Sequence, residues 1–263
     1  MQIALKKGDH NILDETFTIL IPAYNEENHI SGILNEICEF CERENVDWKV
    51  VVSIDGSDRT YEIVSSYSSK YPFVQSSRKS ARGGKGAGIK RVLDLLDTDF
   101  VMLMDADGSM PFSTVVNNLG LLETSDVLIF SRYYNENRIP LIRRFLSKGF
   151  NILVRASLGI KVRDTQSGYK VLKTEPFVRS MKKVGVTNTF FDVALLYYLK
   201  KEEARITEIP SSYNHRDESK FHPLGEVIGQ GVSLVAFMLR HSRFYKYVPK
   251  ELVLLYYRKL RWI

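Results

Sequence analysis

Short apolar runs rich in β-branched residues alternate along this chain with segments of helical periodicity. The runs before position 131 are Phe17–Ile21, Val50–Ile54, Phe100–Met104 and Val127–Phe130. Between the runs, apolar residues recur at the spacing of one helix face, as at Ile89, Val92, Leu93 and Leu96. This alternation is typical of an α/β fold, so we predict a mostly parallel sheet flanked by helices.

The second half of the chain has a different residue pattern. Four arginines crowd its start, at positions 132, 138, 143 and 144, and a long helical stretch then runs to about Leu158. We predict a helix near Phe190–Lys200, a strand at Ala204–Ile209 and two amphipathic segments at the C-terminal end. These features indicate a second lobe.

Composition limits the classes of protein that need to be considered. A length of 263 residues with 44% hydrophobic residues suits one large α/β domain with an appendage. The apolar stretch Val232–Leu239 is far shorter than the ~18 residues of a membrane-spanning helix. The first ten residues lack the apolar core of a secretory signal, so we expect a cytoplasmic protein. Cys38 and Cys41 have no second pair to complete a zinc site, and we expect them to pack inside a helix.

The positive charge is concentrated at the C-terminal end. Residues 240–263 contain seven Lys or Arg and one acid, which equals the net charge of +6 for the whole chain. Because tyrosines, leucines and Trp262 are interleaved with these cations, we expect this segment to lie peripherally on a membrane surface. A helix docked on a partner or on a second copy is the alternative. The rest of the chain is balanced in charge, and we expect no nucleic-acid partner.

Carboxylates follow the predicted strands at the positions where an α/β sheet binds its ligands. Asp55 and Asp58 come after the second strand, and Asp105 and Asp107 come after Phe100–Met104. Two carboxylates on alternate residues can hold Mg²⁺ or Mn²⁺ together with substrate phosphates, so we predict a metal–diphosphate site. Acids that only cap turns are the alternative for any single Asp-x-Asp.

Two further segments near these carboxylates are compatible with nucleotide binding. Gly56 permits a tight turn before a helix with Thr60 as its expected N-cap, and Asp55 can accept hydrogen bonds from a base or ribose or simply form an Asx-turn. The glycine-rich run at residues 82–88 can approach phosphates or form a flexible basic loop. Its spacing differs from that of a P-loop, which disfavours nucleotide triphosphate hydrolysis.

Taken together, these motifs resemble the family 2 inverting glycosyltransferases of the GT-A fold, and within them the dolichyl-phosphate mannose and glucose synthases. The resemblance covers about residues 17–220. Its pieces are PAYNE at 22–26, DGSDRT at 55–60, GGKGAGI at 83–89, DADGS at 105–109, SRY at 131–133, RRFLSKGFN at 143–151, DTQSGYK at 164–170, FFDVALLY at 190–197 and HRDESK at 215–220. Nine ordered pieces are specific for the family and much less specific for the donor sugar.

The resemblance implies roles for individual residues. The nucleotide-sugar site it implies consists of Pro22, Ala23, Tyr24, Glu26, Asp55, Asp58, Lys85, Asp105 and Ala106. The implied metal ligands are Asp105 and Asp107, for Mg²⁺ or Mn²⁺. The residues expected around the acceptor phosphate are Arg132, Arg144, Ser147, Arg216 and Lys220. Several relatives carry Gln two residues after the second Asp as a further ligand, whereas this chain has Ser109.

The resulting hypothesis is transfer of a hexose from a UDP- or GDP-sugar to a polyprenyl or dolichyl phosphate, with inversion. Arginines suit a phosphate acceptor, which needs little deprotonation. We expect Asp107, Asp192 and Arg132 to be catalytic, although Asp192 can also be a charge matched to a helix dipole. The alternatives are a family 2 enzyme with a hydroxyl acceptor, a sugar nucleotidyltransferase and a non-catalytic binding subunit.

The predicted domain boundaries follow from the same reading. We expect a catalytic domain over residues 1–222, with a nucleotide-sugar half at about 15–135 and an acceptor half at about 136–222. Residues 223–263 are expected to form amphipathic basic helices that contact a membrane surface or a second copy of the chain.

Overall fold

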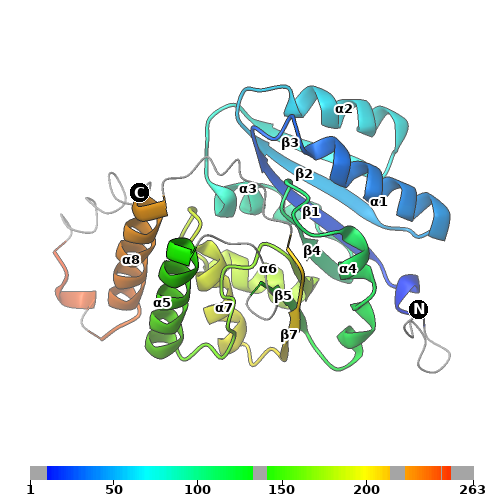
Figure 1. Ribbon diagram of the computed structural model, residues 1–263. Coiled ribbons are helices and arrows are strands. Elements are labelled where there is room, and N and C mark those ends of the chain that lie inside the picture. The colour runs from blue at the N-terminus through cyan, green and yellow to red at the C-terminus, as the bar shows by residue number, and fades with distance from the viewer. Residues whose placement is uncertain (1–10, 133–140, 214–222, 244, 250–263) are drawn as a thin grey trace.

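The computed structural model describes residues 11–132, 141–213, 223–243 and 245–249, and for 141–146 and 223–228 it describes the backbone alone (Figure 1). The strands are β1 (Phe17–Tyr24), β2 (Lys49–Asp55), β3 (Val74–Lys79), β4 (Phe100–Leu103), β5 (Val127–Ser131), β6 (Lys170–Lys173) and β7 (Ile206–Pro210). They form one sheet in the order β3-β2-β1-β4-β6-β5-β7, in which β6 runs antiparallel to both of its neighbours and all other pairs are parallel.

Helices cover both faces of this sheet. Their bounds are α1 (Ile30–Glu44), α2 (Thr60–Lys70), α3 (Lys85–Arg91), α4 (Phe112–Val116), α5 (Leu141–Leu158), α6 (Thr174–Lys183), α7 (Phe191–Lys201) and α8 (Pro223–Arg240). Single 3₁₀ turns lie at Ile12–Asp14, Leu93–Leu95, Leu119–Glu123 and Tyr245–Tyr247. Helices α1, α2 and α4 lie on one face, and α3, α6 and α7 lie on the other (Figure 1).

The hydrophobic core consists of two layers separated by the sheet. In β1, Ile19 and Ile21 pack into the layer beneath α1, whereas Leu20 points into the layer beneath α3 and α7. Strands buried on both faces are apolar at successive positions, as in the parallel sheets of α/β proteins. This explains why the continuous apolar runs of the sequence identify β1, β2, β4 and β5. The predicted mixed α/β fold is confirmed.

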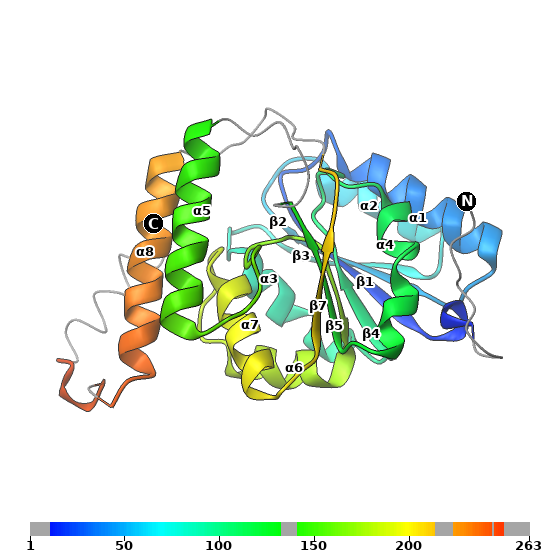
Figure 2. The same cartoon turned by 60° about the horizontal axis from the view of Figure 1, so that its bottom comes forward.

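Helices α5 and α8 lie side by side at one end of the molecule (Figure 2). Val154 of α5 and Leu234 and Phe237 of α8 are buried in the layer that contains α7. The outer sides of the two helices keep large apolar residues exposed, which are Ile152, Leu153, Val235, Met238 and Leu239. No helix in the described part of the chain has both the length and the apolar character needed to cross a bilayer.

Three local expectations differ from the structure. Strands β3 and β6 were not predicted, since β3 is a polar edge strand and β6 is four residues long between lysines. The helix containing Ile89 ends at Arg91 and is followed by a 3₁₀ turn, because the chain must turn there to enter β4. Thr60 is the first residue of α2 rather than its N-cap, and Arg59 takes the cap position.

The two cysteines lie on the buried face of α1, as expected. Both thiols are free. Burial raises the pKa of Cys38 to about 11 and that of Cys41 to about 12. Thiols that remain protonated at neutral pH are weak nucleophiles, which fits a packing role.

Candidate active site

The ends of β1, β2 and β4 bring the predicted carboxylates to one edge of the sheet. In the parallel register, Tyr24 lies opposite Asp55, and Leu20 lies opposite Leu103. Asp55 is therefore the last residue of β2, and Asp105 follows the end of β4 by two residues. The segment that opens α3 joins them, because Gly83 N–H donates to Asp55 (2.7 Å) and Lys85 Nζ donates to Asp105 (2.6 Å).

Asp55 is buried, and its carboxylate organises its surroundings. Oδ2 accepts the Gly83 hydrogen bond, while Oδ1 accepts one from Arg91 Nη1 (2.9 Å). Arg91 also donates to Ser53 Oγ (2.8 Å). A carboxylate offers about four acceptor positions, so two remain after these bonds. The nucleotide contact predicted for Asp55 thus remains a prediction, and Arg91 is a partner that the sequence reading missed.

The loops after β1 and β2 interlock. Asn25 adopts φ +54° and accepts a hydrogen bond from Ser57 N–H (3.1 Å). Gly56 has φ +108°, and a Cβ on it would lie 2.1 Å from the side-chain oxygen of Asn25, so only glycine fits. Asp58 accepts from Thr60 N–H (3.1 Å) and from Glu27 N–H (3.0 Å). Asp58 therefore fixes both loops, and its direct contact with a nucleotide stays a prediction.

The other residues predicted to bind the nucleotide sugar lie on the same loops. Pro22 and Ala23 belong to the end of β1, and Ala106 is buried between the two aspartates that follow β4. Glu26 N–H donates to Thr60 Oγ1 (2.8 Å). Tyr24 is half-buried, and the guanidinium of Arg82 stands 4.5 Å from the centre of its ring.

The glycine-rich segment is packed against the second half of the chain. Gly84 has φ +87°, and a Cβ there would lie 2.4 Å from the carbonyl oxygen of Thr187. Gly86 N–H donates to the same carbonyl (3.0 Å), and a Cβ on Gly86 would lie 2.8 Å from Cβ of Phe191. The glycines permit this close backbone approach, so the segment is ordered by contact with the start of α7. These contacts favour the first of the two alternatives given for this segment over a flexible basic loop.

The two aspartates of the Asp-Ala-Asp motif are both half-buried. Asp105 Oδ1 accepts from Lys85, and Asp107 Oδ1 accepts from Ser109 N–H (2.9 Å). No described group donates to the second oxygen of either carboxylate. Burial opposes the charge of Lys85, but Asp105 and Asp192 outweigh it and raise the Lys85 pKa above its usual value. The charges of Lys85, Asp105 and Asp192 therefore act on one another.

This donor set fits a divalent cation that also binds a diphosphate. Within the described residues, no cluster of three or more His, Cys, Asp or Glu side chains can enclose a metal by itself. Mg²⁺ and Mn²⁺ commonly take one or two carboxylates and complete their coordination with water and substrate phosphates. The uncommitted oxygens of Asp105 and Asp107 supply that smaller number of ligands.

On the other side of the edge, Arg132 forms a two-fold ion pair with Asp164. Its Nε and Nη2 each donate to the carboxylate at 2.8 Å, and its backbone N–H adds a third bond at 3.1 Å. Asp164 is fully buried. Burial opposes its ionisation, but the Arg132 charge outweighs that effect and lowers the Asp164 pKa. Arg132 is therefore held rigidly beside Tyr213, whose ring centre lies 5.7 Å from the guanidinium.

Asp192 lies in the first turn of α7 and pairs with Lys170, the first residue of β6. The Lys170 Nζ to Asp192 Oδ1 distance is 2.5 Å, and the Lys170 side chain has no solvent exposure. Asp192 is thus drawn into the same environment as Lys85 and Asp105. Asp192 is part of a buried charge cluster and is more than a first-turn acid matched to a helix dipole.

The residues predicted to surround the acceptor phosphate are described only in part. Ser147 of α5 is half-buried, and its carbonyl accepts from Asn151, which in turn accepts from Thr165 N–H (2.9 Å). Thr165 follows Asp164, so this part of α5 is tied to the Arg132 pair. Arg144 falls within α5, but its side chain lies outside the described part, as do Arg216 and Lys220.

The comparisons with known proteins agree with this geometry. The family model for glycosyl transferase family 2 matches residues 18–179. The chain belongs to glycosyl transferase family 2. It is 30% identical over 238 residues to a dolichyl-phosphate beta-glucosyltransferase of Trichomonas vaginalis, covering 85% of this chain and 73% of the relative. The human dolichyl-phosphate beta-glucosyltransferase is 26% identical, with 85% and 75% covered. A dolichol-phosphate mannosyltransferase of Pyrococcus furiosus is 27% identical, with 80% and 60% covered.

Solved glycosyltransferases share the fold. Mannosyl-3-phosphoglycerate synthase from Rubrobacter xylanophilus aligns with a TM-score of 0.65 at 19% identity, over 86% of this chain and 74% of that one. Glucosyl-3-phosphoglycerate synthase from Mycobacterium tuberculosis, solved with Mn²⁺, UDP and phosphoglyceric acid, aligns with a TM-score of 0.64 at 20% identity, over 89% and 84%. The GT-A fold of this family 2 enzyme is therefore confirmed.

Proposed function

We propose that this glycosyltransferase transfers a hexose from a nucleoside-diphosphate sugar to the phosphate of a polyprenyl or dolichyl lipid, with inversion. One observation carries the proposal. Carboxylates from the ends of β2 and β4 meet at a single edge, and the rigid Arg132–Asp164 pair lies on the acceptor side of that edge. The names of the relatives from Trichomonas vaginalis and human support a dolichyl-phosphate acceptor and favour glucose as the sugar.

The proposed donor site uses the first half of the chain. Tyr24, Glu26 and Asp55, with the loops fixed by Asp58, form the nucleoside end. Asp105 and Asp107 hold Mg²⁺ or Mn²⁺ with the diphosphate, and the cation offsets the negative charge that develops on the leaving group. Lys85, beside Asp105, adds a second positive charge near the same phosphates.

The proposed acceptor site uses the second half. Arg132 holds its positive charge in a fixed place, which suits the attraction of a phosphate group. A phosphate oxygen is already anionic at neutral pH, so it attacks the anomeric carbon without a strong base. Attack from the face opposite the nucleoside diphosphate inverts the configuration. Asp192 orients the acceptor across the edge from Lys85.

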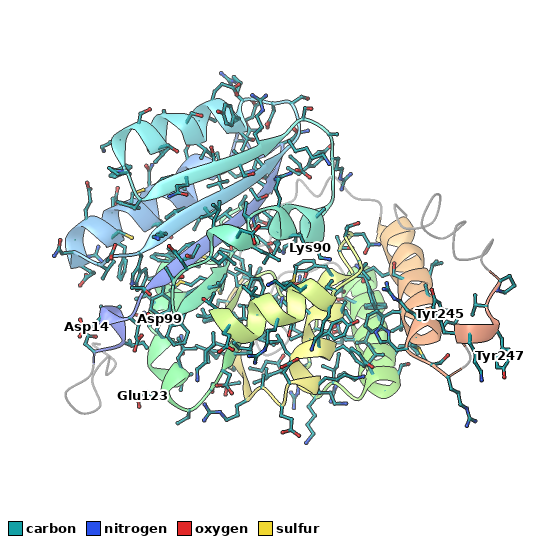
Figure 3. All side chains as sticks on the ribbon, turned by 180° about the vertical axis from the view of Figure 1, so that it is seen from behind. Asp14, Lys90, Asp99, Glu123, Tyr245 and Tyr247 are labelled. Atoms are coloured by element: carbon teal, nitrogen blue, oxygen red, sulfur yellow. The ribbon has the colours of Figure 1, made fainter. Side chains whose placement is uncertain are left out.

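The proposed membrane location is supported by the outer helices. Ile152 is 64% exposed and Val235 is 57% exposed, and the cations Lys148, Arg155 and Arg240 are exposed on the same two helices. Apolar side chains with basic neighbours suit an anionic lipid interface. Tyr245 and Tyr247 stand on the chain just beyond α8 (Figure 3). A lipid acceptor would then be met at the membrane surface.

A donor panel tests this function. Purified protein is incubated with UDP- and GDP-sugars, a short polyprenyl phosphate and Mg²⁺ or Mn²⁺, and release of nucleoside diphosphate is followed together with the lipid product. We expect UDP-glucose to give a β-linked polyprenyl phosphate sugar. Asp107→Ala should lower turnover at least about a hundredfold, whereas Asp94→Ala, an exposed acid in the 3₁₀ turn, should not change it.

The alternatives give distinct results in the same assay. Release of pyrophosphate would indicate a nucleotidyltransferase, and transfer only to glycan hydroxyls would indicate another family 2 acceptor. Full activity of Asp107→Ala without any divalent cation would contradict the proposed site.

A further inference from the structure

Lys170 occupies a position where an apolar residue would be expected. It begins β6 at the centre of the sheet, opposite Leu103 of β4 and Ile129 of β5. Side chains alternate along the strand: Val171 packs into the layer of α1, and Leu172 packs into the layer of α7. Lys170 points to the same face as Leu172, and its side chain is fully covered. The sheet thus places an ammonium group inside a hydrophobic layer.

The ammonium has two partners. It donates to Asp192 Oδ1 at 2.5 Å and to the carbonyl of Ser167. The Asp192 side chain is 6% exposed, and no described residue donates to its other oxygen. Lys170 therefore determines which oxygen of Asp192 is occupied and which is left for another ligand.

Stability alone does not account for this pair. Removing two charges from water costs about as much as their attraction returns, and apolar residues of similar volume commonly replace a buried ion pair without loss. Burial lowers the Lys170 pKa, against the opposing effect of Asp192, which shows the cost of keeping this charge in place. A charge retained at such a position indicates a demand from the site.

The contacts of Lys170 lead to both sides of the site. The ring centre of Phe191, next to Asp192 in α7, lies 5.6 Å from Nζ of Lys85, and Lys85 binds Asp105. Ser167 belongs to the segment that begins with Asp164, the partner of Arg132. One ammonium therefore connects the donor-side carboxylates with the acceptor-side arginine.

We propose that Lys170 is a positioning residue for sugar transfer. Anchored by the Ser167 carbonyl, it binds Asp192 Oδ1 and so holds the Asp192 carboxylate with its second oxygen available to the acceptor. The inference rests on the proposed function and adds to it a residue that contacts neither substrate.

Lys170→Met tests the proposal, with Lys173→Met as a matched control. Lys173 lies on the same strand, and its 42% exposed side chain pairs with Asp126 at 2.9 Å. We expect Lys170→Met to lower kcat about a hundredfold while the KM for the donor changes less than about twofold. Lys173→Met should leave both constants unchanged. A matched drop in the two variants, or a change confined to the donor KM, would overturn the proposal.

A double-mutant cycle separates positioning from general damage. In an Asp192→Asn background, Lys170→Met should have almost no further effect on kcat, because Lys170 acts through Asp192. Independent, multiplying effects would overturn the proposal.

Lys170→Met can also unfold the protein, since it leaves Asp192 unpaired. The double variant Lys170→Met with Asp192→Leu removes both charges, so it leaves no unpaired carboxylate. It should have the wild-type Tm and no transfer activity. Wild-type transfer by this variant would contradict the role of the pair.

Failure of the proposed function gives a different pattern. A wild-type protein that transfers sugar only to hydroxyl acceptors contradicts the proposed acceptor, and the same variants are then compared on that reaction. A wild-type protein inactive with every donor contradicts the function itself. The Tm cycle then decides the inference: non-additive Tm changes for Lys170→Met and Asp192→Asn support the proposed coupling, and additive changes overturn it.

Discussion

Individual buried charges near the strand ends that carry the candidate site determine how the site is arranged. Asp164 and Lys170 have no exposed side-chain surface, yet each binds a residue of the candidate site, Arg132 and Asp192 respectively. Their partners are 32 and 22 residues away in sequence. Such pairs are costly to break, because the remaining charge stays buried without a counter-charge.

At the residue scale, we expect Asp164→Asn to impair both stability and transfer. An amide cannot accept both N–H groups of the Arg132 fork, and the loss of a charged hydrogen bond costs about 2 kcal/mol. Denaturant unfolding measures the stability, and the KM for the polyprenyl phosphate should rise because Arg132 is no longer fixed. Asp97→Asn, which breaks an exposed pair with Lys49, is the control and should change neither. An unaltered acceptor KM in Asp164→Asn would show that Arg132 needs no such support.

At the scale of elements, the glycine-rich segment joins the two halves of the chain. Gly84→Ala would place a methyl group 2.4 Å from the Thr187 carbonyl, at a φ of +87° that side chains rarely adopt. We expect a loss of about 2 kcal/mol in unfolding free energy, together with reduced transfer. Gly32→Ala is the control, because its methyl group, in the first turn of α1, meets nothing within 4 Å. That change should be neutral or stabilise the protein by up to about 1 kcal/mol. Equal effects of the two substitutions would contradict the packing described for Gly84.

A second prediction at this scale concerns the strand ends opposite the site. Asp126, just before β5, pairs with Lys173 at the end of β6 and with Arg205 just before β7. Hydrogen bonds from Arg205 and Lys173 outweigh partial burial and hold the Asp126 pKa well below its usual value. A lowered pKa in the folded state stabilises the protein above the unfolded value near 3.8, and this contribution disappears as the pH falls below it. The stability difference between wild type and Asp126→Asn should therefore be largest at neutral pH and shrink below about pH 4. A difference that is constant from pH 7 to pH 2 would exclude this linkage.

How far the sequence predicts the structure depends on the range of the interactions. The apolar runs identify β1, β2, β4 and β5, because burial on two faces leaves a local signal. The strand β7 was predicted as well, although it is only partly buried. The convergence of Asp55 and Asp105 follows from parallel strands alone. The antiparallel strand β6 and the partner of Asp55, Arg91, could not be predicted this way, since their pairing is set by tertiary contacts. The motif at residues 164–170 contains a signal for β6, because Lys170 is followed directly by the apolar residues Val171 and Leu172.

For the whole molecule, the outer helices define how it would approach a lipid surface. Val235→Glu should reduce co-sedimentation with anionic vesicles about tenfold, since it puts a charge among exposed apolar residues of α5 and α8. Leu121→Glu is the control: this residue is 40% exposed in the turn Leu119–Glu123, elsewhere on the molecule. It should leave vesicle binding unchanged. Equal loss in the two variants would place the lipid contact outside α5 and α8.

Figure 3 shows Asp99 near Asp14 at one end of the sheet, whereas Lys90, a residue of α3, lies away from that end. The two edges at which the strands begin and end therefore have different roles. The hydrogen bond from Thr16 N–H to Asp99 (3.1 Å) and the ion pair of Lys173 with Asp126 support one edge, and the candidate site lies at the other.

The reversed direction of β6 has a consequence for how such enzymes diversify. Because β6 runs antiparallel to β5, it begins at the edge where β5 ends, and residues 159–169 form the loop that leads from α5 into β6. Insertions or replacements in that loop leave the order of the other strands intact. Under the proposed function, changes in this connection would alter the acceptor side, while β1, β2 and β4 would keep the donor side in place.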